Sequence, residues 1–371
     1  MHFTGSIIQP LGSKSLPRMS QINDLMIKGV KDKVFPGGVL LVSKNDSIIF
    51  FEAYGYANIF SKRIMTKNTI FDLASLTKPL ATTLAVMKLI QQGKLDLEQN
   101  LGTVLPEFRD TDKKQIAIRN LLCHNSGLSD YRPYYIELLK IPYNLRKKAL
   151  KQFLINEPIV YPTGKNVLYS DLGFMILGWI VEKVSGRSLD YFVFKDIYKP
   201  LGLKDLFFVN LASERHMGYF AATELCPWRK ILLDGLVHDD NAYVIGGIAG
   251  HAGLFGTAMD VNVLLFSLLS ALHEHSYNFK RDLINKFFER QKDSDRTLGF
   301  DTPSSLDSSC GSLFSKRSIG HLGFTGTSFW MDLDRSIIVI LLTNRIHPSR
   351  DNNKIKKFRP ILHDTVMDII L

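Results

Sequence analysis

The chain has 371 residues, of which 45% are hydrophobic and 22% are charged, and its formal net charge is +10. This composition is typical of a globular protein of about two domains with an ample core. The basic residues are scattered in small groups, and no basic stripe interleaved with aromatic residues accompanies them. The positive charge therefore does not predict nucleic-acid binding.

Cysteine use and hydropathy bear on the cellular compartment. The three cysteines are dispersed, and they are too few for a disulfide framework or a zinc knuckle, which fits a reducing compartment. No apolar run reaches the roughly 18 residues that a membrane span requires. The N-terminus lacks a basic segment followed by an apolar one, so we expect a cytoplasmic protein unless a misplaced start codon hides an export signal.

Sheet patterns lie at both ends of the chain and helical patterns lie between them. Residues 37–56 predict a β-hairpin that turns at Asn45-Asp46. Residues 327–332 and 336–343 predict a second hairpin. Helices with apolar spacing at 17–34 and 353–371 would pack on that sheet. The middle predicts helices near 76–92, 116–123, 171–184, 189–196 and 259–273.

This order predicts two structural units. Residues 1–72 and 258–371 together form an α/β domain whose antiparallel sheet is built from both termini and flanked by helices. Residues 73–257 form a mainly helical insertion domain, and the active site is expected between the two. The sequence leaves the oligomeric state open.

The run Ser75-Leu76-Thr77-Lys78 carries the first chemical signal. Residues three apart on a helix are neighbours, so the Lys78 amine can reach the Ser75 hydroxyl and the two can act as base and nucleophile. The helix that follows is apolar nearly all round, so we expect it to be buried and to lower the pKa of Lys78 by desolvation. The alternative is that Ser75 caps the helix and Lys78 extends to solvent.

A second signal is Tyr169-Ser170-Asp171, directly ahead of a helix. The positive end of the helix dipole, together with a nearby Lys78, would favour the Tyr169 phenolate for proton transfer. Alternatively, Asp171 is only the N-cap of that helix and Tyr169 is a buried aromatic residue.

The third signal is the glycine-rich stretch from Gly320 to Thr327, which includes His321, Gly323 and Phe324 and leads into a strand. Glycines there allow a substrate backbone to approach the strand edge, and the Phe324 N–H is a candidate oxyanion donor. A bend with a structural histidine is the alternative reading.

Together the three stretches resemble the serine β-lactamase and penicillin-recognising DD-peptidase superfamily, in particular its class C β-lactamase-like branch. The motif order fits: S-x-x-K at Ser75, a Y-x-N-like motif at Tyr169, and a K-T-G-like triplet at His321-Leu322-Gly323. The resemblance implies that Ser75 attacks a carbonyl and forms an acyl-enzyme, with Lys78 and Tyr169 sharing the proton transfers. It also implies that the N–H groups of Ser75 and Phe324 hold the oxyanion, and that no metal or other cofactor is needed.

Two departures from the family pattern limit the substrate. Asp171 stands where the motif has Asn, and an ionised carboxylate near Lys78 would raise the pKa of the amine. His321 stands where the lactamases have Lys, and a mostly neutral histidine binds a substrate carboxylate less well than an ammonium does. We expect a serine hydrolase of small esters, amides or D-amino-acid peptides with weak β-lactamase activity. Polar residues just past the last strand, namely Asn344, Arg345 and Arg350, are candidates to replace the charge of the missing lysine.

Two other function classes remain open. One is a penicillin-binding sensor or other non-catalytic binding module of the same fold, which acylates slowly or not at all. The other is a metallohydrolase built from residues whose types suit zinc but whose spacing matches no helix-borne zinc motif, namely His238, Asp239, Asp240 and His251.

Overall fold

The structure is a computed structural model, and it describes residues 16–212, 218–273, 278–292 and 294–371. Its centre is a six-stranded antiparallel sheet with the order β3-β2-β1-β11-β10-β9. The bounds of these strands are β1 Gly37–Lys44, β2 Ser47–Asn58, β3 Arg63–Ile64, β9 Ile319–Leu322, β10 Ser328–Asp332 and β11 Ile337–Thr343. Strands from the two ends of the chain meet where β1 pairs with β11. The prediction of a sheet built from both termini is confirmed.

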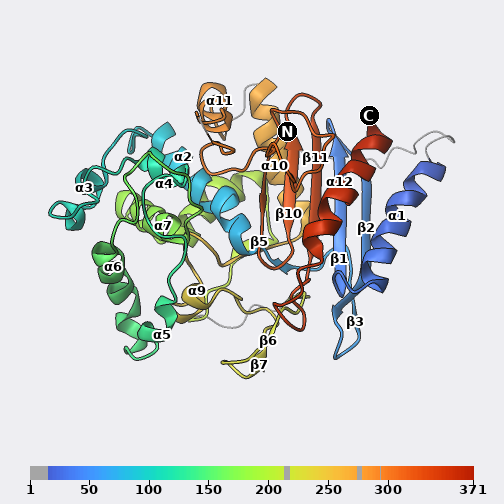
Figure 1. Cartoon of the computed structure of the whole chain (residues 1–371), viewed down its shortest axis with the longest axis horizontal. Coiled ribbons are helices and arrows are strands. Elements are labelled where there is room, and N and C mark those ends of the chain that lie inside the picture. Colours follow the sequence, from blue (N-terminus) through green and yellow to red (C-terminus); the bar gives the residue numbers. More distant parts are fainter. Residues whose placement is uncertain (1–15, 213–217, 274–277, 293) are drawn as a thin grey trace.

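The two central strands are apolar on both faces, which explains their continuous hydrophobic sequence. In β1, Leu40 and Val42 point into a core shared with α1 (Leu16–Lys31) and α12 (Ile355–Ile370). Val39 and Leu41 point into the larger core on the other face, where α10 (Ala258–His273) packs. Figure 1 shows α1 and α12 together on one side of the sheet and the helical region on the other.

The helical region surrounds two buried helices, α2 (Leu84–Gln91) and α7 (Asp171–Ser185). Its other helices are α3 Leu101–Val104, α4 Ile118–Leu122, α5 Tyr134–Leu138, α6 Arg146–Asn156, α8 Leu189–Val193 and α9 Asp240–Val244, and α11 Arg281–Phe288 packs on α2. Two small sheets complete the fold: β4 (Phe71–Asp72), β8 (Leu254–Gly256) and β5 (Leu206–Phe208), and the hairpin of β6 (Leu225–Cys226) and β7 (Ile231–Leu232). Helices α3, α5, α6, α9 and α11 and these short strands were not predicted.

One predicted helix, near 76–92, has a different local structure. The chain makes a 3-10 turn at Ala74–Leu76, continues as a π-helix over Lys78–Thr83 and becomes α-helical only at Leu84. Pro79 lies in the first turn of the π-helix, where its missing N–H is tolerated. Local widening of this kind is common at functional sites. The predicted boundary between the domains, at residues 72–73 and 257–258, stays a prediction.

No helix in the described part of the chain is both long and apolar enough to cross a membrane. All three cysteines are buried and unpaired.

Candidate active site

Ser75 lies on a strained turn directly after β4. The residue before it, Ala74, has φ +48°, a left-handed conformation that costs a non-glycine residue about 1–2 kcal/mol. The buried carboxylate of Asp72 accepts hydrogen bonds from the Ala74 N–H (2.9 Å) and from the His238 N–H (2.7 Å). Asp72 therefore anchors the turn that presents Ser75, and it connects that turn to the loop before α9.

Lys78 is fully buried beside Ser75 and is surrounded by hydrogen-bond acceptors. Its Nζ lies 3.1 Å from Ser75 Oγ, 3.1 Å from the His251 carbonyl oxygen and 2.7 Å from Asp171 Oδ1. Burial favours the neutral amine, but the Asp171 carboxylate and the Tyr169 phenol outweigh it, so the pKa of Lys78 is raised. The predicted lowering by desolvation is wrong, whereas the predicted opposing effect of Asp171 is confirmed.

Asp171 is not the N-cap of α7. The cap is Ser170, whose hydroxyl accepts a hydrogen bond from the Gly173 N–H at 3.2 Å. Asp171 is the first helical residue, and its partly exposed carboxylate pairs with Lys78 instead. The capping alternative is therefore wrong, because the Ser170 side chain, three positions ahead of Gly173, already caps the helix.

Tyr169 lies next to this pair, with the Lys78 ammonium 4.7 Å from its ring centroid. Its phenol hydrogen-bonds with Ser75 and Lys78. Burial raises the pKa of Tyr169 more than the Lys78 charge lowers it, so the expected resting phenolate is not supported. The ring is held by His124, which stacks on it at 4.6 Å and accepts the Ser170 N–H on Nδ1 at 2.8 Å.

His321 is buried at the end of β9, and its ring centroid is 6.0 Å from that of Tyr169. Its Nδ1–H donates to the Leu322 carbonyl oxygen at 2.9 Å, and Nε2 has no hydrogen-bond partner in the described residues. Burial lowers the pKa of His321 to about 4, against the attraction of Asp301. The imidazole is therefore neutral at pH 7, which strengthens the expectation that it does not replace a lysine.

Gly323 and Phe324 form the turn after β9 and lie against the segment that leads to Ser75. A Cβ on Gly323 would be only 2.6 Å from the Leu73 carbonyl oxygen, so this close approach requires glycine. The hydroxyl of Thr325 donates to the Asp72 carbonyl oxygen at 2.7 Å, and that of Thr327 donates to the Leu73 carbonyl oxygen at 3.2 Å. These bonds fix the Phe324 backbone relative to the Ser75 turn.

The cations after the last strand are engaged in the structure and do not replace the missing lysine. Arg345 donates to the Phe324 carbonyl oxygen at 2.9 Å, and its guanidinium lies 4.8 Å from the Phe324 ring. Arg350 pairs with the buried Glu224, and Asn344 bonds backbone groups of neighbouring strands. A different cation lies closer to the site: the Arg296 guanidinium is 5.3 Å from the Tyr169 ring and forms an ion pair with Asp301.

The four residues considered for zinc do not share a site. His238 Nε2 lies 3.1 Å from Glu224 Oε2, His251 Nε2 lies 2.9 Å from Asp239 Oδ1, and Asp240 pairs with Arg229 at 2.6 Å. No group of three or more metal-ligating side chains occurs in the ranges that the structure describes.

Sequence reasoning brought together Ser75, Lys78, Tyr169, Asp171 and His321, but it missed the residues that position them. His124 was missed because its partners, Tyr169 and Ser170, are distant from it in sequence. Asp72 and Arg296 carried no signal, because the contacts of Asp72 with His238 and of Arg296 with the Tyr169 ring join residues that are distant in sequence.

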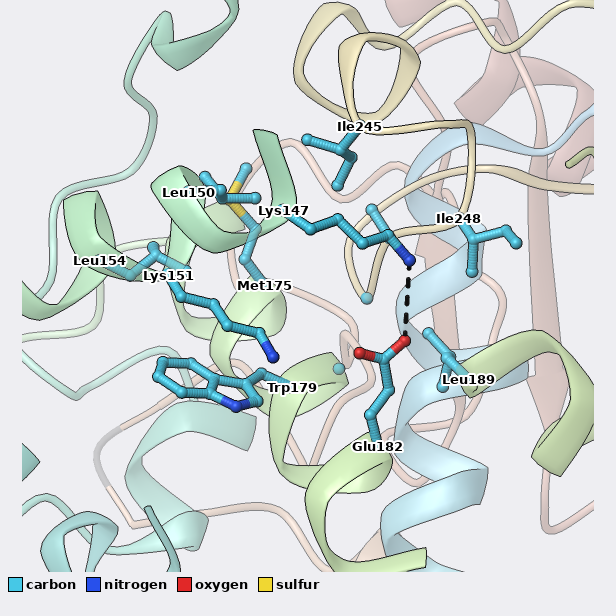
Figure 2. Close-up of a pocket in the computed structure, with 13 residues that line it drawn as sticks. Lys147, Leu150, Lys151, Leu154, Met175, Trp179, Glu182, Leu189, Ile245 and Ile248 are labelled. Carbon is cyan, nitrogen blue, oxygen red and sulfur yellow. Dashed lines mark ion pairs between the residues drawn. The ribbon is translucent and has the colours of Figure 1, made fainter. Parts of the chain in front are cut away.

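A separate pocket of about 50 Å³ opens between α6, α7 and the segment 245–250. Figure 2 shows the Lys147–Glu182 ion pair across it and the Lys151 side chain over the Trp179 ring. Its lining includes none of the predicted site residues, so this pocket is not the candidate active site.

Comparison with known proteins assigns this arrangement to a family. The match to the Beta-lactamase family covers residues 22–360. The chain belongs to the Beta-lactamase family. It is 34% identical over 343 residues to the N-acetylmuramyl-L-alanine amidase of Bacillus subtilis (strain 168), and the match covers 84% of this chain and 78% of that protein. It is 30% identical over 371 residues to an Escherichia coli (strain K12) protein named "Putative D-alanyl-D-alanine carboxypeptidase", covering 92% and 85%.

Solved structures with low sequence identity to this chain have the same fold. The penicillin-binding protein homologue from Pyrococcus abyssi superposes with a TM-score of 0.75 at 18% identity, covering 94% of this chain and 77% of that one. EstCE1, a hydrolase with promiscuous acyltransferase activity, gives 0.72 at 21% identity, covering 94% and 99%. The β-lactamase/transpeptidase-like fold and the assignment as a serine hydrolase are therefore confirmed.

Proposed function

We propose that this protein is a serine amidase that acts through an acyl-enzyme on Ser75. The observation that carries the proposal is the cluster at Ser75, where a buried lysine and a phenol lie within hydrogen-bond reach of one hydroxyl and a carboxylate pairs with that lysine. A nucleophile, a base and a group that orients the base are the parts that covalent acyl transfer requires. The 34% identity to an amidase over most of both chains supports the same reaction class.

The proton path follows from the resting charges. Because the pKa of Lys78 is raised, the resting amine is an ammonium paired with Asp171. Substrate binding would exclude water from this pair, and the lower dielectric would favour transfer of the Lys78 proton to Asp171. The neutral amine, 3.1 Å from Ser75 Oγ, then accepts the serine proton as the new C–O bond forms. Tyr169, which hydrogen-bonds with both Ser75 and Lys78, then donates its proton to the leaving amine and is reprotonated by the Lys78 ammonium.

The oxyanion would be held by the backbone N–H groups of Ser75 and Phe324. Both groups lie on segments that the hydroxyls of Thr325 and Thr327 tie together. Fixed donors of this kind stabilise the transition state without reorganisation.

The substrate class follows from the neutral groups around the site. A buried His321 with a pKa of about 4 supplies no positive charge to a terminal carboxylate next to the scissile bond. We propose an amide with neutral groups beside its carbonyl, specifically the bond between the lactyl carbonyl of N-acetylmuramic acid and L-alanine, the class named for the Bacillus subtilis relative. Small esters should react as well, and β-lactams, which carry a carboxylate, should react weakly.

The test is intact-protein mass spectrometry and product analysis with wild-type enzyme and Ser75→Ala. The substrates are N-acetylmuramyl-L-alanyl-D-isoglutamine, an N-acyl-D-alanyl-D-alanine, a short p-nitrophenyl ester and a cephalosporin. We expect the wild-type enzyme to release the dipeptide from the muramyl substrate and to carry an ester-derived adduct on Ser75. Ser75→Ala should show neither the released dipeptide nor the adduct. Faster cleavage of the cephalosporin or the D-alanyl-D-alanine substrate would contradict the proposed substrate.

One observation favours the sensor alternative. Both candidate bases, Lys78 and Tyr169, rest in their protonated forms because their pKa values are raised. A sensor would be labelled stoichiometrically by a fluorescent β-lactam and keep the label, whereas the amidase should turn over its ester and amide substrates.

A further inference from the structure

Two short hairpins far apart in sequence form an exposed apolar surface that includes none of the candidate active-site residues. One is the β2–β3 hairpin and the other is the β6–β7 hairpin, and Figure 1 shows both extending from the body of the molecule on the same side. Their exposed apolar side chains, with one from the segment between them, are Ile59, Phe60, Ile64, Tyr219, Leu225 and Ile231. We call these six residues the hairpin face. Large apolar groups gathered in this way on a protein surface mark an interaction site.

The hairpin face is continuous because its parts are bonded to one another. The Tyr219 hydroxyl donates to the Ile64 carbonyl oxygen at 2.7 Å. The buried His347 accepts the Ile59 N–H at 3.0 Å and donates to the Thr223 carbonyl oxygen at 2.8 Å. The His347 ring also meets the Phe60 ring edge to face, with the centroids 5.3 Å apart. The two hairpins are therefore held in one fixed arrangement.

The charges in the tip segments of the same hairpins are positive. Residues 59–67 contain three cations and residues 225–232 contain two, and neither segment contains an acidic residue. Arg63, Lys67 and Arg229 are paired with Asp234, Glu52 and Asp240. Lys62 and Lys230 lie at the hairpin tips, are exposed and make no ion pair with the residues that the structure describes. Each tip therefore combines apolar side chains with an unpaired ammonium group.

We propose that the hairpin face docks this protein on the surface of an anionic lipid bilayer. Apolar side chains flanked by lysines are the combination that inserts into the boundary between headgroups and acyl chains. The net charge of +10 adds long-range attraction to an anionic surface. A second copy of this chain fits less well, since symmetric packing of the hairpin tips would bring their unpaired lysines toward one another.

The test is co-sedimentation of the full chain with vesicles of phosphatidylcholine containing about 30% phosphatidylglycerol, beside vesicles of phosphatidylcholine alone. We expect binding to the anionic vesicles only, and less binding as salt rises from about 0.05 to about 0.5 M. Lys62→Gln and Lys230→Gln should each weaken the partition about fivefold. Phe60→Ser should weaken it at least about tenfold.

Matched controls come from exposed residues elsewhere. Phe194→Ser, Ile361→Ser and Lys94→Gln change comparable groups outside the hairpin face and should leave vesicle binding unchanged. Hydrolysis of a soluble p-nitrophenyl ester should be equal in all variants. Failure of the membrane-docking proposal is therefore distinguishable from failure of the proposed amidase activity. Equal sedimentation of wild type and Phe60→Ser would overturn it. So would a dimer, detected by analytical ultracentrifugation without lipid, that Phe60→Ser dissociates.

Discussion

The substitution Gly323→Ala tests the proposed oxyanion site most directly. The added Cβ would lie 2.0 Å from Thr327 Oγ1 and 2.6 Å from the Leu73 carbonyl oxygen. The threonine hydroxyl can rotate away, but the carbonyl belongs to the backbone just ahead of Ser75. Since ordinary contacts begin at 3.4 Å, the two segments must separate by about 0.8 Å (3.4 minus 2.6).

This displacement predicts the size of the kinetic effect. A hydrogen bond of about 2.9 Å that lengthens by 0.8 Å is no longer a hydrogen bond, so the Phe324 N–H is lost as a donor to the oxyanion. Loss of one such donor typically lowers kcat by about 10²–10³, or about 3–4 kcal/mol of transition-state stabilisation. Overpacking also costs about 1–3 kcal/mol of folding free energy. For 371 residues this lowers Tm by about 1–4 °C.

The assay is kcat for a p-nitrophenyl ester, together with the thermal unfolding midpoint of the same protein. The control is Gly173→Ala on α7, where the nearest atom to the new Cβ, the Leu121 carbonyl oxygen, is 3.6 Å away. It should retain full activity. If Gly323→Ala also retained full activity, the Phe324 N–H would not be the oxyanion donor.

Three further predictions concern charges at the site. Asp171→Asn removes the main group that raises the pKa of Lys78, so burial should then lower that pKa. The rising limb of the kcat/KM–pH profile should move to lower pH. An unchanged profile would contradict the proposed role of Asp171. Because the pKa of His321 is lowered to about 4, the imidazole binds a proton more tightly in the unfolded chain than in the folded one. The free energy of unfolding should therefore fall by up to about 3 kcal/mol as pH decreases from 6.5 to 4. Urea unfolding of His321→Asn should show a smaller loss over the same pH range. In Asp72→Asn the amide oxygen can replace only one of the two carboxylate oxygens that accept N–H groups. The substitution also removes a buried charge, whose unfavourable burial raises the pKa of Asp72. We expect kcat to fall at least about tenfold while urea unfolding changes by less than about 2 kcal/mol, and an unchanged kcat would exclude a positioning role.

The sheet could be predicted from sequence because its signals are local. The apolar runs of β1 and β11 and the turn residues between each hairpin's strands specify where strands begin and end. The order of three weak motifs then specified the family. Helices such as α5 and α11 were missed because each is short and is stabilised mainly by tertiary packing.

For the pKa values at the site, the sequence could predict which effects compete but not which effect is larger. Burial of Lys78 and the charge of Asp171 act in opposite directions, and their balance depends on a distance of 2.7 Å that the sequence does not contain. The same holds for Tyr169, where burial outweighs the lysine. Whether Asp171 or Ser170 caps α7 was likewise decided by packing, since both residue types are good caps.

The pairing of charges around Ser75 leads to a last prediction about substrate choice. Lys78 is paired with Asp171, Arg296 is paired with Asp301, and His321 is neutral. A substrate carboxylate therefore reaches Lys78 or Arg296 only by breaking a partly buried ion pair, which costs free energy. Asp301→Asn would release Arg296 next to the Tyr169 ring. We expect this variant to raise kcat/KM for an N-acyl-D-alanyl-D-alanine relative to a neutral ester, measured side by side, with Asp334→Asn, which frees the exposed Arg317, as the control. An unchanged ratio would mean that charge pairing does not select against carboxylates, and that the preference for neutral substrates must then come from the shape of the site.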